Sequence, residues 1–171
     1  MEQNQTYQRS STRIPQPSEV TSKQKDDAMG AYLMMFATWF IGLPLPFLNL
    51  FASIIYYVVN KRNSRFVGFH AHQSLITQLP VTLMTAGLIS WTIYILVMDH
   101  SFNQYFIGYA IATAGANLFY VVFSIIACVM AYKGKMYYIP LFGRLSYAKY
   151  FGPNAVKINE NSEVNLPPSG K

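Results

Sequence analysis

The sequence predicts an all-α integral membrane protein with four helical segments: a Pro-broken first pair, then a long helical hairpin, between disordered polar tails. Of its 171 residues, 52% are hydrophobic and 12% are charged, whereas a soluble domain has about 25% charged residues. Acidic and basic residues are also absent from three long windows, residues 28–60, 66–98 and 101–132, apart from His70 and His72. A run of about 20 apolar residues crosses the hydrocarbon core of a bilayer. Each window is therefore long enough to enter a membrane.

The two ends of the chain are predicted to be disordered tails, residues 1–27 and 152–171. Both are rich in Gln, Ser, Asn, Pro and charged residues and have few large apolar side chains to bury. The first 27 residues have no apolar central region, so we expect no cleavable signal peptide. The first hydrophobic segment would then direct insertion, and the membrane domain would occupy residues 28–151.

The first hydrophobic region is interrupted by Pro44 and Pro46, which predicts helical segments at residues 28–43 and 47–60. Each segment would rise about 22 Å, which is short of the roughly 30 Å hydrocarbon core. The two pieces either stack end to end as one broken span or form a hairpin that returns to its starting side. The positive-inside rule favours the hairpin, because basic residues then share one face and both termini are cytoplasmic.

The second half of the membrane domain is predicted to be a long antiparallel hairpin of residues 66–98 and 105–132, joined by a short polar loop. The first helix would be about 50 Å long, so its first turns are expected at the interface, with a kink at Pro80. Residues 133–151 mix basic and aromatic side chains, which suits the lipid headgroup layer. Six residues are expected to anchor the domain to anionic headgroups: Lys61, Arg62, Arg65, Lys133, Lys135 and Arg144.

Polar side chains form one stripe on each helix of the long hairpin. At 100° per residue, His72 points away from the first stripe. The two stripes are expected to meet, because polar groups in a bilayer face the bundle interior. They provide either interhelical hydrogen bonds, worth about 0.6 kcal/mol each, or a hydrophilic path, and packing is favoured. The candidates are His70, Gln73, Ser74, Thr77, Gln78 and Thr85 on the first helix, with Asn117, Tyr120 and Ser124 on the second.

Small residues repeat at four-residue spacing on the last helix, at Gly108, Ala112 and Ala116. Small side chains let helices approach closely, so this face predicts helix packing, either within the bundle or between protomers of a homo-oligomer. The single cysteine, Cys128, is expected to be an apolar packing residue.

No enzymatic, cofactor or metal site is expected. The predicted spans contain no acidic residue, and the sequence has no phosphate-binding loop or nucleophile elbow. His70 and His72 diverge by about 160° on a helix and cannot share one ion. The net charge of +6 lies beside the apolar segments, where topology and anionic lipid account for it, so no nucleic-acid partner is expected.

Three segments, residues 60–65, 66–75 and 131–141, together carry a family resemblance. Phe69, His70 and Gln73 match a Phe-His-x-x-Gln-Ala pattern, with Ser74 at the Ala position, and the closing segment matches at Gly134, Tyr137, Tyr138 and Pro140. Over residues 27–151 the chain resembles the small bacterial membrane proteins related to the chloroplast inner-envelope import subunit Tic-twenty. The resemblance implies a four-helix membrane protein and, for plastid members, a part in protein import.

Together these observations predict a non-enzymatic subunit or scaffold of a membrane complex, with protein translocation as the activity that the resemblance suggests. The alternative is a small channel or transporter that uses the polar stripes as its path. The expected location is the bacterial inner membrane, multi-pass, and the expected partners are anionic lipid headgroups, other membrane proteins or further copies of this chain.

Overall fold

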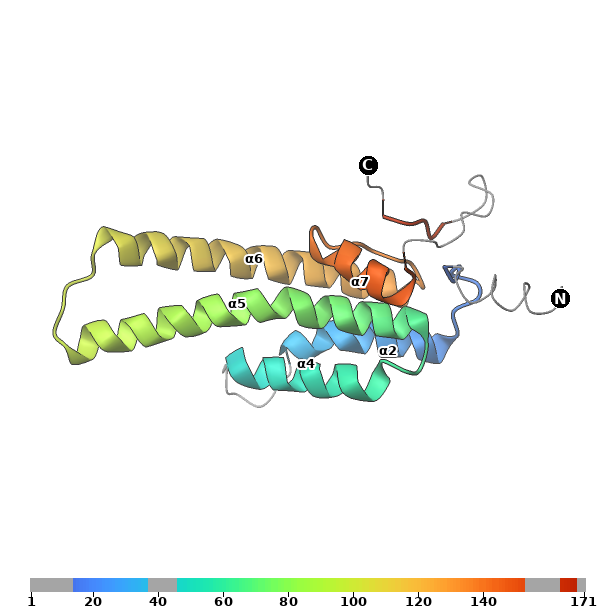
Figure 1. Ribbon diagram of the computed structural model, residues 1–171, viewed down its shortest axis with the longest axis horizontal. Helices are drawn as coiled ribbons and strands as arrows, with labels where there is room; N and C mark the ends of the chain where they lie inside the picture. The colour runs from blue at the N-terminus through green and yellow to red at the C-terminus, as the bar shows by residue number, and fades with distance from the viewer. Residues whose placement is uncertain (1–13, 37–45, 153–163, 169–171) are drawn as a thin grey trace.

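The computed structural model describes residues 14–36, 46–152 and 164–168, and the regular secondary structure of this part of the chain consists of helices alone (Figure 1). Two long helices form an extended hairpin, and the shorter helices cover only one half of it (Figure 1). The elements in chain order are α2 (Ser22–Leu33), the 3₁₀ turn η1 (Met34–Phe36), α4 (Pro46–Asn60), α5 (Arg65–Val97), α6 (Gln104–Tyr132) and α7 (Phe142–Tyr150).

The hairpin of α5 and α6 has the predicted bounds to within one residue. Ser64 caps α5 by accepting a hydrogen bond from the Val67 amide at 3.1 Å, and Asn103 caps α6 through the Phe106 amide at 2.9 Å. The 33 residues of α5 continue through Pro80 without a break in the helix. Both helices are long and apolar enough to cross a membrane, judged by length and composition.

Helices α2 and α4 form an antiparallel pair beside the half of the hairpin where α5 begins. The Tyr56 hydroxyl near the end of α4 donates to the Asp27 carbonyl at 2.7 Å, so the start of α2 and the end of α4 lie together (Figure 1). This arrangement is the predicted hairpin and not the end-to-end broken span. The connection that contains Pro44 lies outside the described residues.

The predicted number of helical segments is wrong, because the described residues contain five α-helices. The additional helix, α7, lies in the segment that was expected to rest in the headgroup layer. It packs against the first turns of α5, where Tyr147 and Phe151 contact Phe69 in one small core cluster. Helix α2 also begins at Ser22, six residues before its predicted start, because Thr21 and Gln24 form a capping box.

Parts of both tails are packed, so the prediction of disorder is wrong for residues 14–27 and 164–168. The Asn165 side chain is 1% exposed and donates to the Pro15 carbonyl at 2.7 Å and the Gly134 carbonyl at 3.0 Å. Gln16 in turn accepts from the Val164 and Asn165 amides at 3.0 and 3.1 Å. We call this reciprocal arrangement the Gln16–Asn165 clasp. Hydrogen bonds of these two amide side chains therefore hold the terminal segments together, a role that large apolar side chains have in most proteins.

The clasp lies over the segment that follows α6. Met136 donates its amide to the Asn165 Oδ1 at 2.8 Å, and the Tyr138 hydroxyl donates to the Leu166 carbonyl at 2.7 Å. Burial raises the pKa of Tyr138 above its ordinary value, so the hydroxyl remains protonated and able to donate. The N-terminal segment, the C-terminal segment and residues 133–140 therefore form one packed unit at the end of the molecule where α5 begins and α6 ends.

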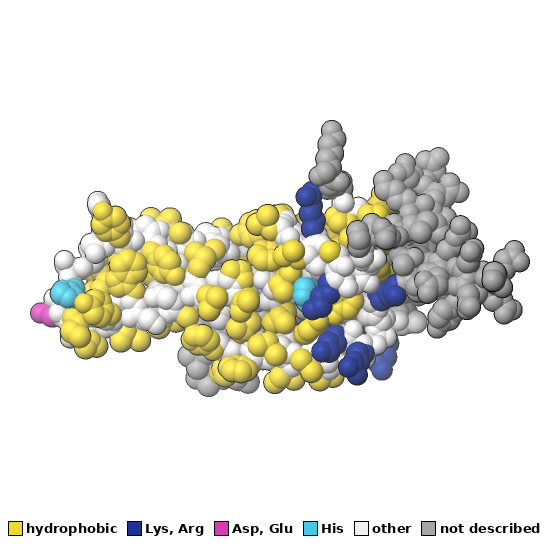
Figure 2. All heavy atoms as spheres, in the orientation of Figure 1, with side chains coloured by type: hydrophobic (Ala, Val, Ile, Leu, Met, Phe, Trp, Pro, Cys, Tyr) yellow, Lys and Arg dark blue, Asp and Glu magenta, His cyan; other side chains and the backbone are white. Residues whose placement is uncertain are grey.

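Both clusters of buried hydrophobic residues in the described part of the chain lie in this same half. One cluster joins α2, α5 and α6 with Val20 and Ile139, through Ala28, Tyr32, Phe66, Ala127 and Ala131. Farther along the hairpin, large apolar side chains are exposed, such as Leu83 at 59%, Leu96 at 67% and Ile111 at 68% (Figure 2). Extensive exposed apolar surface of this kind marks an interaction surface or contact with lipid.

Gly68 allows α7 to approach α5, which yields a direct test of this packing. A Cβ at Gly68 would collide with the Tyr150 ring and lie 2.9 Å from the Lys61 carbonyl oxygen. We expect Gly68→Ala to lower the free energy of unfolding by about 1–3 kcal/mol, as overpacking does. Detergent-mediated unfolding followed by circular dichroism would measure the change.

The matched control is Gly108→Ala on α6, where a Cβ would meet no atom within 4 Å. Alanine is the better helix former by up to about 1 kcal/mol, so this variant should be neutral or slightly more stable. Equal effects of the two substitutions would contradict the packing of α7 on α5.

Candidate functional site

The first turns of α5 carry a buried polar cluster, which we call the polar core: His70, Gln73 and Ser74 with Tyr32 of α2. His70 and Gln73 are both fully buried. The Gln73 Nε2 donates to the Tyr32 hydroxyl at 2.8 Å, and that hydroxyl lies 3.0 Å from the His70 Nδ1. Since the hydroxyl already accepts from Gln73, it can donate to Nδ1, which then acts as an acceptor on a neutral imidazole.

The polar core ties three segments of the chain together. Gln73 donates to the Tyr137 carbonyl at 3.0 Å and accepts from the Ile139 amide at 3.4 Å. Ser74 donates to the Ala31 carbonyl at 2.8 Å. These bonds connect α5 with α2 and with the segment after α6, so this part of the predicted stripe holds the bundle together.

Aromatic rings enclose His70 within the polar core. The ring centroids of Phe66, Phe69 and Tyr32 lie 4.5, 5.0 and 5.7 Å from that of the imidazole. Its Nε2 forms no hydrogen bond of ordinary geometry, although the Lys135 backbone interacts with the ring. Across the described ranges, no group of three or more His, Cys, Asp or Glu side chains could hold a metal ion.

Farther along the hairpin, the two predicted stripes do meet. Asn117 of α6 donates to the Thr85 hydroxyl of α5 at 3.1 Å. Gln78 accepts from Ser53 of α4 at 2.5 Å, and Thr77 donates to the Gln73 carbonyl in its own helix at 2.7 Å. These contacts are the interhelical and local hydrogen bonds expected of polar groups inside a bundle.

Two members of the α6 stripe, Tyr120 and Ser124, are buried one helical turn apart, and their hydroxyl groups interact with each other and not with α5. Sequence reasoning also missed two partners of the stripes, Tyr32 and Ser53. Ser53 could have been found as a polar residue inside the apolar run of α4. Tyr32 had no such signal, because a tyrosine is common in any membrane helix.

His72 lies on the other side of α5, as helical projection predicted. Its Nδ1 is 2.9 Å from the Ser146 hydroxyl of α7, and its ring faces Tyr57 and Tyr150 at 5.6 and 6.1 Å between centroids. The two neighbouring histidines therefore belong to separate environments.

The two ends of the α5–α6 hairpin differ in charge. The six predicted headgroup anchors lie near the end of α4, the start of α5, the end of α6 and in α7, and Figure 2 shows Lys and Arg side chains gathered towards that end. We call this the basic end. At the tip of the hairpin the exposed residues include Asp99 and His100, and Asp99 adopts a φ of 51°. Figure 2 shows acidic and histidine side chains at this opposite end.

The small-residue face of α6 is largely uncovered by the described part of the chain. Gly108 and Ala112 are exposed, Ala116 is half-buried, and a Cβ at Gly108 would meet nothing within 4 Å. The prediction that this face packs against another helix of the same chain is therefore not supported at Gly108.

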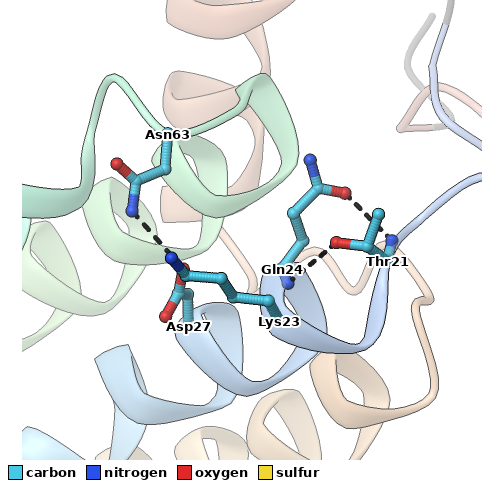
Figure 3. A pocket seen from close by; sticks show the side chains of 5 residues that line it. All are labelled: Thr21, Lys23, Gln24, Asp27 and Asn63. Carbon is cyan, nitrogen blue, oxygen red and sulfur yellow. Dashed lines mark hydrogen bonds between the residues drawn. The ribbon is translucent and has the colours of Figure 1, made fainter.

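A pocket of about 300 Å³ opens beside the start of α2 (Figure 3). Thr21 and Gln24 line the pocket, and each hydrogen-bonds to the other residue's backbone in the capping box. The Asn63 Nδ2 donates to the Asp27 carboxylate at 3.4 Å. Lys23 completes the lining. Its polar groups mainly serve to cap α2 and to join α2 to the end of α4.

Comparison with known proteins identifies the family. The model of the magnetosome magnetite crystal formation protein family (MamF/MmsF) matches residues 25–146, from α2 into α7. No curated protein and no solved structure matches the chain. The predicted resemblance to Tic-twenty is therefore wrong, and the positions that suggested it, Phe69, His70 and Gln73, are explained by packing in and around the polar core. The chain belongs to the magnetosome magnetite crystal formation protein family.

Proposed function

We propose that this protein acts in magnetite crystal formation as a non-enzymatic membrane subunit that presents the tip of the α5–α6 hairpin to the lumen of the magnetosome. The family match over residues 25–146 carries the proposal, because the family is described by that process and its members belong to the magnetosome membrane. Translocation of proteins, which rested on the Tic-twenty resemblance, is not part of it.

Helix lengths support two membrane crossings. At 1.5 Å per residue, the 12 residues of α2 and the 15 residues of α4 rise about 18 and 22 Å, less than the roughly 30 Å hydrocarbon core. Helices α5 and α6, with 33 and 29 residues, exceed it. In this proposal only the long hairpin crosses, and α2 and α4 return to the side from which they start.

Charge supports the orientation. Lysine and arginine favour the cytoplasmic side of a membrane, and the described ones flank the basic end. The basic end, with both packed terminal segments, would therefore be cytoplasmic. The tip with Asp99 and His100 would then lie in the lumen, where the crystal grows.

Carboxylate and imidazole groups are ligands that iron accepts. One aspartate and one histidine are too few to hold a resident ion, but a mineral surface supplies its own remaining ligands. The side chains of the polar core and of Thr85 and Asn117 form hydrogen bonds within the bundle. This supports a structural use of the stripes over a transport path or an enzymatic centre.

The exposed small-residue face of α6 supports assembly with a second membrane helix. Gly108 and Ala112 leave its backbone open to close approach. In this proposal several copies, or a copy and another membrane protein, would place more than one tip against the same crystal.

The test is the crystal itself, in a magnetite-forming bacterium that carries the full-length chain. We expect loss of the protein, and also the double substitution Asp99→Asn with His100→Gln, to give smaller crystals in vesicles of unchanged number. Crystal size would be measured by electron microscopy.

Ser101→Ala in the same loop is the matched control and should leave crystal size unchanged. Normal crystals in cells that lack the protein would overturn the proposed function. A defect in those cells but not with the double substitution would overturn only the role of the tip.

A further inference from the structure

Three helices meet at one corner of the basic end and bring two lysines onto one aromatic ring. The Lys61 and Lys149 ammonium nitrogens lie 5.5 and 5.2 Å from the centroid of the Tyr57 ring. Tyr150 donates its hydroxyl to the Tyr57 hydroxyl at 3.1 Å, and His72 packs on the same ring. We call this set of five residues the Tyr57 corner.

The position of each lysine has an ordinary explanation, and the Lys149 ammonium also hydrogen-bonds to the Tyr57 hydroxyl. Their convergence nevertheless places two like charges at one ring. Lys61 directly follows α4 and Lys149 lies in the last turn of α7, where cations suit the negative end of the helix dipole. That effect acts on each helix separately and does not require both side chains to turn towards one ring. Attraction to the ring accounts for one cation, whereas two ammonium groups at the same ring repel each other.

Within the described part of the chain, no carboxylate forms an ion pair that balances Lys61 or Lys149. Asp27 of α2 lies at this end of the bundle, but its carboxylate accepts a hydrogen bond from Asn63, and its backbone carbonyl accepts one from Tyr56. The corner is therefore a concentration of positive charge without an internal counterion among those residues. An anion from outside the chain would supply one.

The corner is also held in place before any ligand binds. Ser146 of α7 is fully buried and hydrogen-bonds to His72 of α5, which fixes the two helices against each other. Because Gly68 has no side chain, the Tyr150 ring packs directly against α5. Lys61 is half-buried and Lys149 is exposed, so the preformed corner is open on one side.

We propose that the Tyr57 corner binds one phosphate-bearing anion, either the headgroup of an anionic phospholipid or free phosphate, between the Lys61 and Lys149 ammonium groups. Phosphate oxygens accept several charge-assisted hydrogen bonds at once, which suits two ammonium donors. The Tyr57 hydroxyl accepts from Tyr150, so its own hydrogen is free to donate to a phosphate oxygen. The site goes beyond the role in crystal formation and does not depend on it.

The test compares lipid retention by the full-length protein in nanodiscs of phosphatidylcholine with and without phosphatidylglycerol. Native mass spectrometry would count the phosphatidylglycerol molecules that remain bound, and a titration would give the affinity. We expect Lys61→Gln with Lys149→Gln to bind phosphatidylglycerol at least about tenfold more weakly, since each lost charge-assisted bond is worth a tenfold change or more. Tyr57→Phe, which keeps the ring, should weaken binding to a smaller extent.

The charge-matched control is Lys23→Gln with Lys25→Gln, which removes two charges of α2 from the same end of the molecule but none from the corner or from the six predicted headgroup anchors. It should retain the lipid as the wild type does. Equal weakening in both double variants, or none in either, would overturn the proposal. If Lys61→Gln with Lys149→Gln does not fold, unchanged binding by Tyr57→Phe overturns it.

A second arm identifies the source of the phosphate. Inorganic phosphate added to the protein in phosphatidylcholine nanodiscs should displace bound phosphatidylglycerol if free phosphate occupies the corner. Retention of the lipid at high phosphate, with loss only in the corner variants, would assign the site to the headgroup. Both results support a phosphate site at the Tyr57 corner.

Discussion

Gln73→Leu is expected to lower the free energy of unfolding by about 2–4 kcal/mol. The substitution keeps a side chain of similar length but removes bonds to Tyr32, the Tyr137 carbonyl and the Ile139 amide. Each buried group left without a partner costs about 1–3 kcal/mol. Because Gln73 makes two hydrogen bonds to the segment after α6, that segment should loosen from α5.

Unfolding in mixed detergent micelles, followed by circular dichroism, would measure this loss. Gln104→Leu is the matched control, because Gln104 is the exposed first residue of α6. A surface change of this kind should stay within about 0.5 kcal/mol of the wild type. If the two variants were equally stable, the hydrogen bonds of Gln73 would contribute nothing to the fold.

Asn165→Asp is expected to release both terminal segments while leaving the long hairpin folded. The side-chain nitrogen of Asn165 donates to the carbonyls of Pro15 and Gly134. A carboxylate of the same shape places an oxygen against these two carbonyl oxygens and buries a charge without a partner. Gln16 accepts from the Val164 and Asn165 amides, so undocking of the C-terminal segment should also free residues around Gln16.

Amide hydrogen exchange would detect the release as faster exchange at Val164, Asn165 and Met136, whose amides donate within the Gln16–Asn165 clasp. Exchange in α5 and α6 should change little. Leu166→Ala is the control, because that side chain is 42% exposed and its carbonyl still accepts from Tyr138. Unchanged exchange in Asn165→Asp would contradict the clasp.

The helices of the hairpin were predictable because their signals are local. The uncharged windows alone predicted the bounds of α5 and α6 to within one residue. Helical projection also separated His70 from His72 and placed Asn117 on the face that meets Thr85. These features depend on the 3.6-residue period of a helix, which can be projected onto the sequence without knowledge of the tertiary structure.

The polar core and the Tyr57 corner were only partly predictable. His70 and Gln73 stood out as polar residues at the start of an apolar helix, but their partner Tyr32 lies about 40 residues earlier. Lys149 and Tyr57 are about 90 residues apart, and nothing in their local sequence relates them. Such pairs depend on how α7 packs on α5, which is decided by side-chain shape, including the missing side chain at Gly68.

Short local motifs also misled the assignment of family. Phe69, His70 and Gln73 form a pattern that any buried junction of aromatic and amide side chains could produce. The match of the family model extends over 25–146 and so uses most of the predicted membrane domain, residues 28–151.

The sequence by itself determined which segments are apolar, where the long helices begin and end, and which end of the molecule carries the basic residues. These properties follow from composition and helical period along the chain. Only the tertiary structure decided that α7 forms and that Gln16 and Asn165 join the two terminal segments over residues 133–140. These depend on contacts between residues far apart in the chain, whose hydrogen bonds and close packing exist only once the helices are assembled.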